Sequence, residues 1–174
     1  ANFNNEIGVG LTILGTERCH KVLVIEMGMR GLGQIENLSK YSEPDIAVIT
    51  NIGSSHIGLL GSKENILSAK CEIVKYLNPN GLVIIPANDF LLEETLKKSW
   101  KGRIKKVKLS FLEDQNKTIE KDDDLNGFYN RSKNSISIED KIFEISYGGF
   151  HNALNFMFAY AVSKELCLDF EYFN

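Results

Sequence analysis

The sequence predicts an α/β fold, in which a mostly parallel sheet with crossover helices is joined to a small antiparallel β region. Two observations predict it. Short apolar runs alternate with amphipathic segments over about residues 1–100, and β-rich runs separated by polar loops fill about residues 101–147, before a final helix at about 151–166. A chain of 174 residues with 43% hydrophobic content is long enough for one ordinary core, so we expect a single domain over residues 1–174.

Three apolar runs without polar alternation are expected to form strands that are buried on both faces of a sheet. They are residues 22–25, 46–49 and 82–85. The segments 33–41 and 63–77 between them have helical periodicity, and a further helix is expected after Asn88. This order of strands and helices predicts parallel strands joined by crossover helices.

The β-rich part of the chain is expected to form antiparallel hairpins. Its clearest strands are residues 135–138 and 142–145, and the acidic run 120–124 is expected to be a solvated loop. The final helix, at about 151–166, would bury one apolar stripe, formed by Leu154, Met157, Phe158, Ala161 and Val162.

Composition excludes several classes of protein. The sequence has neither a run of apolar residues long enough to cross a membrane nor the layout of a secretory signal at its start. The three cysteines, Cys19, Cys71 and Cys167, stand far apart, which favours a reducing, cytoplasmic environment. Because no apolar run is long enough, we expect no membrane span. Because the net charge is −3 and no basic stripe is present, we expect no nucleic acid as partner.

One lysine lies on the apolar side of a predicted helix. In segment 63–77 the apolar stripe includes Ile66 and Ile73, and Lys70 occupies the stripe position between them. Two interpretations stay open. The stem can pack while the ammonium reaches water, or burial can favour the neutral amine. A neutral amine can take up carbon dioxide and become a carbamate, which is an anionic ligand for a hard metal ion.

Two further polar residues follow predicted strands. Glu26 comes directly after the run 22–25, and His56 follows the run 46–49. In an open parallel sheet, ligands bind beyond the carboxyl ends of the strands, where both residues would lie. Each alone reads as an ordinary loop residue. Together with a carbamate they would form an oxygen-rich site that suits Mg²⁺ better than Zn²⁺.

The start of the last helix carries a second polar group. Asn152 and Asn155 are three residues apart and share a helix face, so their amides could contact a flat heterocycle. The alternative is that His151 or Asn152 caps the helix. Asn88, after the third apolar run, is equally open, because it could cap a helix or line a nucleotide pocket.

These residues together resemble the central, ATPase domain of the Mur ligase family. The resemblance rests on five motifs in order, which read NFNNEIG at 2–8, IEMGMRG at 25–31 with GQI at 33–35, TNIG at 50–53 with His56, AK at 69–70, and HNALN at 151–155. The opening motif is most similar to the family's type that adds D-alanyl-D-alanine. The resemblance covers nearly the whole chain and is weakest from about residue 100 to 144.

The resemblance implies a P-loop NTPase-like domain of an ATP-dependent and Mg²⁺-dependent amide-bond ligase in peptidoglycan synthesis. Its substrates would be UDP-N-acetylmuramoyl-tripeptide and D-alanyl-D-alanine, joined through an acyl phosphate by a monomeric cytoplasmic enzyme. By motif, Glu26 would hold one magnesium ion, and His56 with carbamylated Lys70 a second. The adenine side would be lined by Asn88, His151, Asn152 and Asn155, and the UDP-linked peptide would be faced by Asn4, Asn5 and Glu6.

Some parts of the family pattern are missing. No Gly-x-x-Gly-Lys-Thr/Ser phosphate-binding loop is present in the sequence, and Phe150 stands where a basic residue is frequent. We therefore expect a partial domain that lacks the phosphate-binding loop and the flanking domains, and that makes no amide bond alone. Three alternatives remain, namely a ligase of the same fold with another substrate such as folate and glutamate, a noncatalytic nucleotide-binding module, and an α/β domain without a site.

Overall fold

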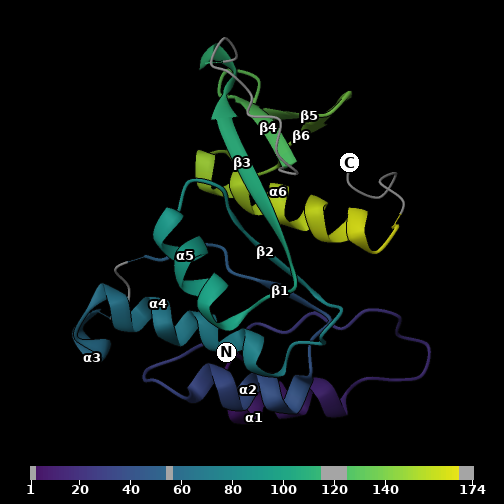
Figure 1. Ribbon diagram of the computed structural model, residues 1–174. Helices are drawn as coiled ribbons and strands as arrows, with labels where there is room; N and C mark the ends of the chain where they lie inside the picture. The colour runs from purple at the N-terminus through teal and green to yellow at the C-terminus, as the bar shows by residue number, and fades with distance from the viewer. Residues whose placement is uncertain (1–2, 54–56, 115–124, 169–174) are drawn as a thin grey trace. The chain divides into compact units, whose positions relative to one another are not determined.

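The computed structural model describes residues 3–53, 57–114 and 125–168 (Figure 1). The helices are α1 (Glu6–Leu14), α2 (Gln34–Ser42), α3 (Ile57–Leu60), α4 (Lys63–Cys71), α5 (Phe90–Ser99) and α6 (Phe150–Glu165), with short 3-10 helices η1 (Glu72–Tyr76) and η2 (Leu112–Asp114). The strands are β1 (Ile46–Val48), β2 (Leu82–Pro86), β3 (Arg103–Phe111), β4 (Leu125–Asn130), β5 (Ser135–Ile138) and β6 (Lys141–Glu144). The predicted α/β class is confirmed.

The chain divides into two compact units. Unit 1 comprises Ala1–Ala47, Ile52–Val83 and Leu91–Arg103, and unit 2 comprises Val48–Asn51, Ile84–Phe90 and Ile104–Asn174. The single domain expected from the sequence stays a prediction.

The six strands follow one another in the sheet in the order of the sequence, from β1 to β6. The backbone amide of Leu82 donates to the carbonyl of Asp45, and the backbone amide of Ile49 donates to the carbonyl of Ile84. β1 and β2 therefore run parallel. β3 pairs with β4 in parallel, whereas β4 with β5 and β5 with β6 are antiparallel. The expected combination of a mostly parallel sheet and an antiparallel region is confirmed.

The prediction for residues 104–147 is wrong in part. The region from 104 to 147 is not made of hairpins alone, since β3 and β4 run parallel, with Val107 opposite Leu125 and Phe111 opposite Tyr129. A parallel pair needs a long connection, and residues 112–124 supply one where a hairpin would have a tight turn. The predicted loop at 120–124 lies outside the described residues.

The apolar run at 22–25 is not a buried strand. The structure assigns no strand to it, and Val22, Leu23 and Val24 are 44%, 41% and 82% exposed. Hydrophobicity alone does not make a strand, because strand backbone needs a partner to complete its ladder. Ile25, at the end of the run, does pack against a core.

The predicted helices are confirmed, with one change of geometry. Segment 63–77 is α-helical only through Cys71 and continues as the 3-10 helix η1. Two helices were not predicted. They are the four-residue helix α3, which is too short to show a helical period, and α1, in which Gly8 and Gly10 lower the intrinsic propensity. The signal for α1 in the sequence was Asn5, whose side chain caps the helix by accepting from the Gly8 amide at 2.9 Å.

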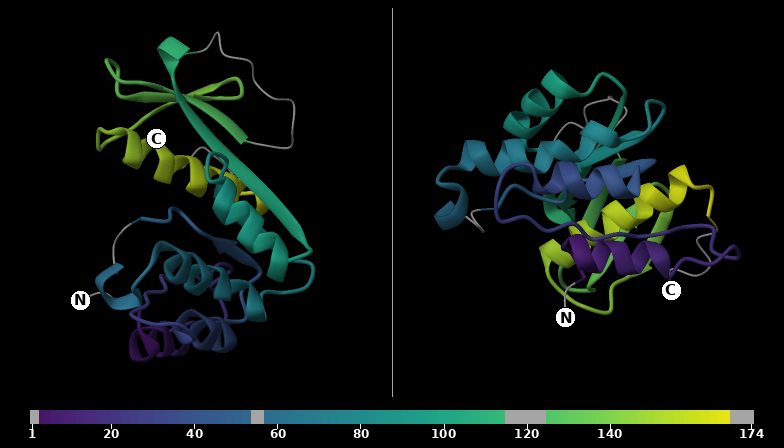
Figure 2. Two further views of the ribbon diagram at one scale, coloured as in Figure 1. Left: turned by 60° about the vertical axis from the view of Figure 1, so that its left-hand side comes forward. Right: turned by 90° about the horizontal axis from the view of Figure 1, so that it is seen from below.

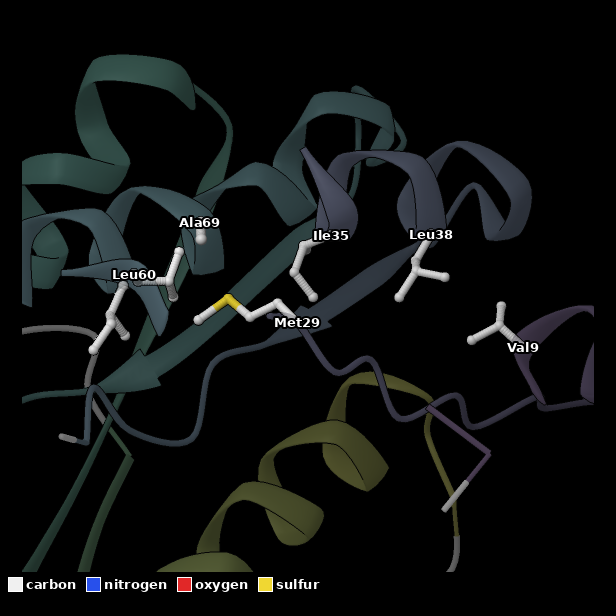
Figure 3. Packing of buried hydrophobic residues seen from close by; sticks show 7 residues of the cluster. Val9, Met29, Ile35, Leu38, Leu60 and Ala69 are labelled. Carbon is white, nitrogen blue, oxygen red and sulfur yellow. The ribbon is translucent and has the colours of Figure 1, made fainter. Parts of the chain in front are cut away.

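The core of unit 1 joins the segment after Glu26 to helix α4 (Figure 3). Met29 extends toward Ala69 and Leu60, and Ile35 and Leu38 of α2 lie in the same cluster. Helix α1 contributes Val9 and contacts α2. Residues close to Glu26 and to Lys70 in the chain therefore pack in the same hydrophobic cluster.

The core of unit 2 lies between α6 and the strands beside it (Figure 2). Met157, Phe158 and Ala161 of α6 are buried as predicted, and Leu154 and Val162 are half-buried. Gly127 allows α6 to lie close to β4, since a Cβ atom there would overlap the thioether of Met157. The core thus anchors the helix whose first two turns carry His151, Asn152 and Asn155, three of the predicted adenine-side residues.

No helix within the described ranges is both long enough and apolar enough to cross a membrane.

Candidate active site

Glu26 is oriented by the start of the chain. The side-chain amide of Asn4 donates to Glu26 Oε1 at 2.9 Å. The backbone amide of Gly28 donates to the backbone carbonyl of Asn4 at 2.7 Å. Gly28 permits this approach, because a Cβ atom there would lie 2.9 Å from the Asn4 side chain. The structure therefore brings together Asn4 and Glu26, which the sequence assigned to peptide and magnesium separately. The exposed carboxylate is a hard oxygen ligand of the kind that Mg²⁺ prefers.

The neighbouring residues Asn5 and Glu6 have visible structural roles. Asn5 caps α1, and Glu6 lies in the first turn of that helix, where a negative charge is favourable. Glu6 also lines a hollow of about 450 Å³ with Ile7, Gly10, Ile13, Leu14 and Tyr41. Their assignment to the peptide substrate stays a prediction.

Lys70 lies in the last turn of α4 and is half-buried. Burial lowers the pKa of its ammonium below the ordinary range of lysine, because removal from water penalises the charged form. Ala69 before it and Cys71 after it are buried, so this turn of α4 lies against the core. A lowered pKa increases the fraction of neutral amine, which is the form that reacts with carbon dioxide.

The third predicted metal ligand, His56, lies outside the described residues. Among the residues that are described, no three His, Cys, Asp or Glu side chains gather closely enough to hold a metal ion. The predicted ligand set of Glu26, His56 and carbamylated Lys70 therefore stays a prediction. Glu26 and Lys70 fit this ligand set, because Glu26 is an exposed carboxylate and Lys70 is a half-buried amine of lowered pKa.

In unit 2, the first two turns of α6 carry His151, Asn152 and Asn155. Neither His151 nor Asn152 caps the helix in the usual way, because the N-cap is Gly149 and makes no side-chain hydrogen bond. The Asn152 amide instead donates to the Gly148 carbonyl at 2.9 Å. His151 and Asn155 are exposed, so their polar groups are accessible to a ligand.

Asn88 lies in the turn that joins β2 to α5, and its side chain is exposed. This is the carboxyl end of a parallel strand, where the sequence placed it. Its assignment to the nucleotide stays a prediction.

Sequence reasoning missed the residues that hold these loops in shape. Tyr129 donates to Asn134 Oδ1 at 2.9 Å and accepts from the Gly149 amide at 3.0 Å, so a strand residue fixes the turn before α6. Glu72 similarly accepts from two amides at the start of α2. Spacing gives no signal for either, because the backbone amides that they bind lie 20 residues or more away in the chain.

Known proteins resemble this chain in sequence and in structure. The family model described as the Mur ligase middle domain matches residues 1–163. The UDP-N-acetylmuramoyl-tripeptide--D-alanyl-D-alanine ligase of Synechocystis is 34% identical over 171 residues, which are 98% of this chain and 35% of the relative. The protein of the same name from Bacillus subtilis is 47% identical over 92 residues, which are 53% of this chain and 20% of the relative.

Two solved structures give the same picture. MurF from Acinetobacter baumannii superimposes with a TM-score of 0.77 at 25% identity, over 98% of this chain and 37% of that one. MurF ligase from Thermotoga maritima, in complex with ADP, superimposes with a TM-score of 0.72 at 26% identity, over 97% of this chain and 38% of that one. The chain thus spans little more than a third of the length of these proteins.

Proposed function

Because the chain belongs to the Mur ligase family, whose middle domain it matches over residues 1–163, we propose that its parent protein is an ATP-dependent amide-bond ligase. It adds D-alanyl-D-alanine to UDP-N-acetylmuramoyl-tripeptide during peptidoglycan synthesis in the cytoplasm. Two relatives that carry this name support the choice of substrates. The observation in the structure that carries the proposal is the Glu26 carboxylate, oriented by Asn4 and followed by a segment that packs against α4, which bears Lys70.

The proposed reaction has two steps. A carboxylate oxygen of the tripeptide attacks the γ-phosphorus of ATP, and ADP leaves. The amine of D-alanyl-D-alanine then attacks the acyl carbon, loses a proton, and expels inorganic phosphate. Both steps depend on positioning and on neutralising the charge of the phosphoryl group.

Glu26, His56 and carbamylated Lys70 would hold magnesium, which neutralises charge on the phosphate oxygens when it is bound. Asn4 would keep the Glu26 carboxylate in one orientation through its hydrogen bond. The adenine would lie against Asn88, His151, Asn152 and Asn155, and the UDP-linked peptide against Asn5 and Glu6. Alone, residues 1–174 would not ligate, because no phosphate-binding loop motif is present in them.

Turnover by the purified parent tests the proposal. We expect sustained, Mg²⁺-dependent release of ADP over many turnovers only when the UDP-linked tripeptide and D-alanyl-D-alanine are both present, and none with folate and glutamate. Lys70→Ala and Glu26→Gln should each lower kcat by about 100-fold or more, since each removes a ligand that places charge in the transition state. Turnover with folate and glutamate would replace the proposed substrates, and full activity of Lys70→Ala would remove the lysine from the site.

A further inference from the structure

The carboxylate of Glu72 joins two segments that are far apart in the sequence. Glu72 begins η1, directly after α4, and lies two residues after Lys70. Its Oε1 accepts from the Gly33 amide at 2.7 Å, and its Oε2 accepts from the Glu36 amide at 3.3 Å. Gly33 is the N-cap of α2 and has no side chain to cap the helix itself. Glu72 thus supplies the cap from another element.

The segment before α2, which we call the Glu26 loop (residues 26–33), is held from its other side as well. The Arg30 amide donates to Gln34 Oε1 at 2.6 Å, so the first residue of α2 reaches back to the loop. Gly33 has a φ of +81°, a left-handed conformation that closes the loop onto the helix. At the start of the loop, Gly28 and Glu26 both bond to Asn4.

These bonds form one connected path. It leads from η1 through the Glu72 carboxylate to the start of α2, along the Glu26 loop, and to the carboxylate of Glu26. Apolar packing runs beside it, since Met29 of the loop and Ala69 of α4 lie in one cluster. Apolar packing fixes the distance between two segments only loosely, whereas two charge-assisted hydrogen bonds accepted by one carboxylate also fix their direction.

We infer that Glu72 is a positioning residue of the proposed ligase. Its carboxylate holds the Glu26 loop at a fixed position relative to the end of α4 that carries Lys70. The inference rests on the proposed function, in which Glu26 and Lys70 must present their ligands at a fixed separation. Glu72 touches neither substrate nor metal in this account. It acts through the Glu26 loop, and misplacement of such a loop by about 1 Å can cost on the order of 100-fold in rate.

The test compares Glu72→Ala and Glu72→Gln with Asn78→Ala in the intact parent protein. Glutamine keeps one acceptor oxygen, so it retains one of the two bonds if the protein folds normally. Asn78 is the matched control, because it also fixes a turn of unit 1 by side-chain hydrogen bonds, to Asp45 and Asn80. Asn78 lies before β2 and its partner Asp45 before β1, at the amino ends of these strands, and neither residue belongs to the Glu26 loop or to α4.

We expect Glu72→Ala to speed amide hydrogen exchange across residues 26–36, to raise the Mg²⁺ concentration at half-maximal rate about 10-fold, and to lower kcat by about 10-fold to 100-fold. Glu72→Gln should give an intermediate effect. Asn78→Ala should lower the Tm to a similar extent while leaving kcat, the Mg²⁺ dependence and the exchange of residues 26–36 unchanged.

Three results would overturn the inference in different ways. Unchanged exchange over residues 26–36 in Glu72→Ala would show that the carboxylate does not hold the loop, whatever the activity. Faster exchange with unchanged kcat and Mg²⁺ dependence would leave Glu72 as a helix cap alone. A wild-type parent without ligase activity would overturn the proposed function, and with it the catalytic role, while the exchange measurement would still report on the loop.

Discussion

At the scale of the residue, Lys70 shows how packing changes chemistry. Burial holds the pKa of its ammonium below the ordinary lysine range, so folding with a charged Lys70 costs free energy. The cost is full below the folded-state pKa. It falls as the pH rises through that pKa, and it vanishes above the pKa of the unfolded chain, where the amine is neutral in both states.

This behaviour predicts that Lys70→Met raises the Tm at neutral pH in bicarbonate-free buffer, because methionine keeps an apolar stem without the charge. The increase should shrink as the pH is raised toward the ordinary pKa of lysine. Thermal unfolding at several pH values measures it, with Lys63→Met as the control, since Lys63 is an exposed lysine of the same helix. A difference in Tm that does not depend on pH would contradict the account.

Tyr129 has an equally local role in unit 2. Its hydroxyl is the shared partner of Asn134 and of the Gly149 amide, and its side chain is only 3% exposed. Tyr129→Phe should lower the free energy of unfolding by about 0.5–1.5 kcal/mol, because two half-buried polar groups lose their hydrogen bond to the buried hydroxyl. In the parent it should also weaken ATP binding, since the turn leads into His151 and Asn152.

The matched control is Tyr160→Phe in the same unit. The Tyr160 hydroxyl bonds to Glu139, an exposed carboxylate, so the partner can turn to water when the hydroxyl is removed. Calorimetric titration with ATP should give weaker binding for Tyr129→Phe and unchanged binding for Tyr160→Phe. Equal affinities in all three proteins would mean that the turn before α6 does not shape the nucleotide site.

At the scale of the element, the contact between β4 and α6 depends on the absence of one side chain. Gly127→Ala should lower the free energy of unfolding by about 1–3 kcal/mol, because the added methyl group meets the fully buried side chain of Met157. Combined with Met157→Ala, the same change should cost much less, which denaturant unfolding of the double-mutant cycle measures. Strictly additive effects would show that the two residues do not compete for one space.

Much of the element pattern could be predicted from the sequence, because buried runs and amphipathic stripes are local signals. The strands at 46–48 and 82–86 and the helices α2 and α6 follow this rule. The run at 22–25 has the same local signal but no strand in the structure, because a strand also requires a neighbour, which is a property of the whole sheet.

In the candidate site too, local signals could be predicted from the sequence, whereas contacts between distant segments could not. Lys70 was singled out by its place in the apolar stripe of a helix and Glu26 by its place after an apolar run, although that run forms no strand. The structure gives each an environment that fits its proposed role. Glu72 and Tyr129 could not be predicted, because their function depends on partners brought close only by tertiary packing. The hydrogen bond from Asn4 to Glu26 was hidden for the same reason.

At the scale of the whole molecule, helix α1 leaves a large apolar surface accessible. Ile7, Leu11 and Leu14, which we call the α1 surface, are 75%, 55% and 83% exposed. An apolar patch of this kind favours association. We expect the chain, produced by itself, to form larger species in sedimentation experiments, and the double variant Leu11→Lys, Leu14→Lys to shift toward the monomer. A monomeric wild-type chain at the same concentration would contradict this prediction.

The central claim is that a peptide carboxylate is activated by ATP before the amide bond forms. Its most direct test uses tripeptide substrate labelled with ¹⁸O in the terminal carboxylate, together with ATP, Mg²⁺, D-alanyl-D-alanine and the intact parent. The account predicts that inorganic phosphate carries one ¹⁸O atom for each amide bond formed, because the carboxylate oxygen leaves with the phosphoryl group. Product with unlabelled phosphate, or no product at all, would contradict it.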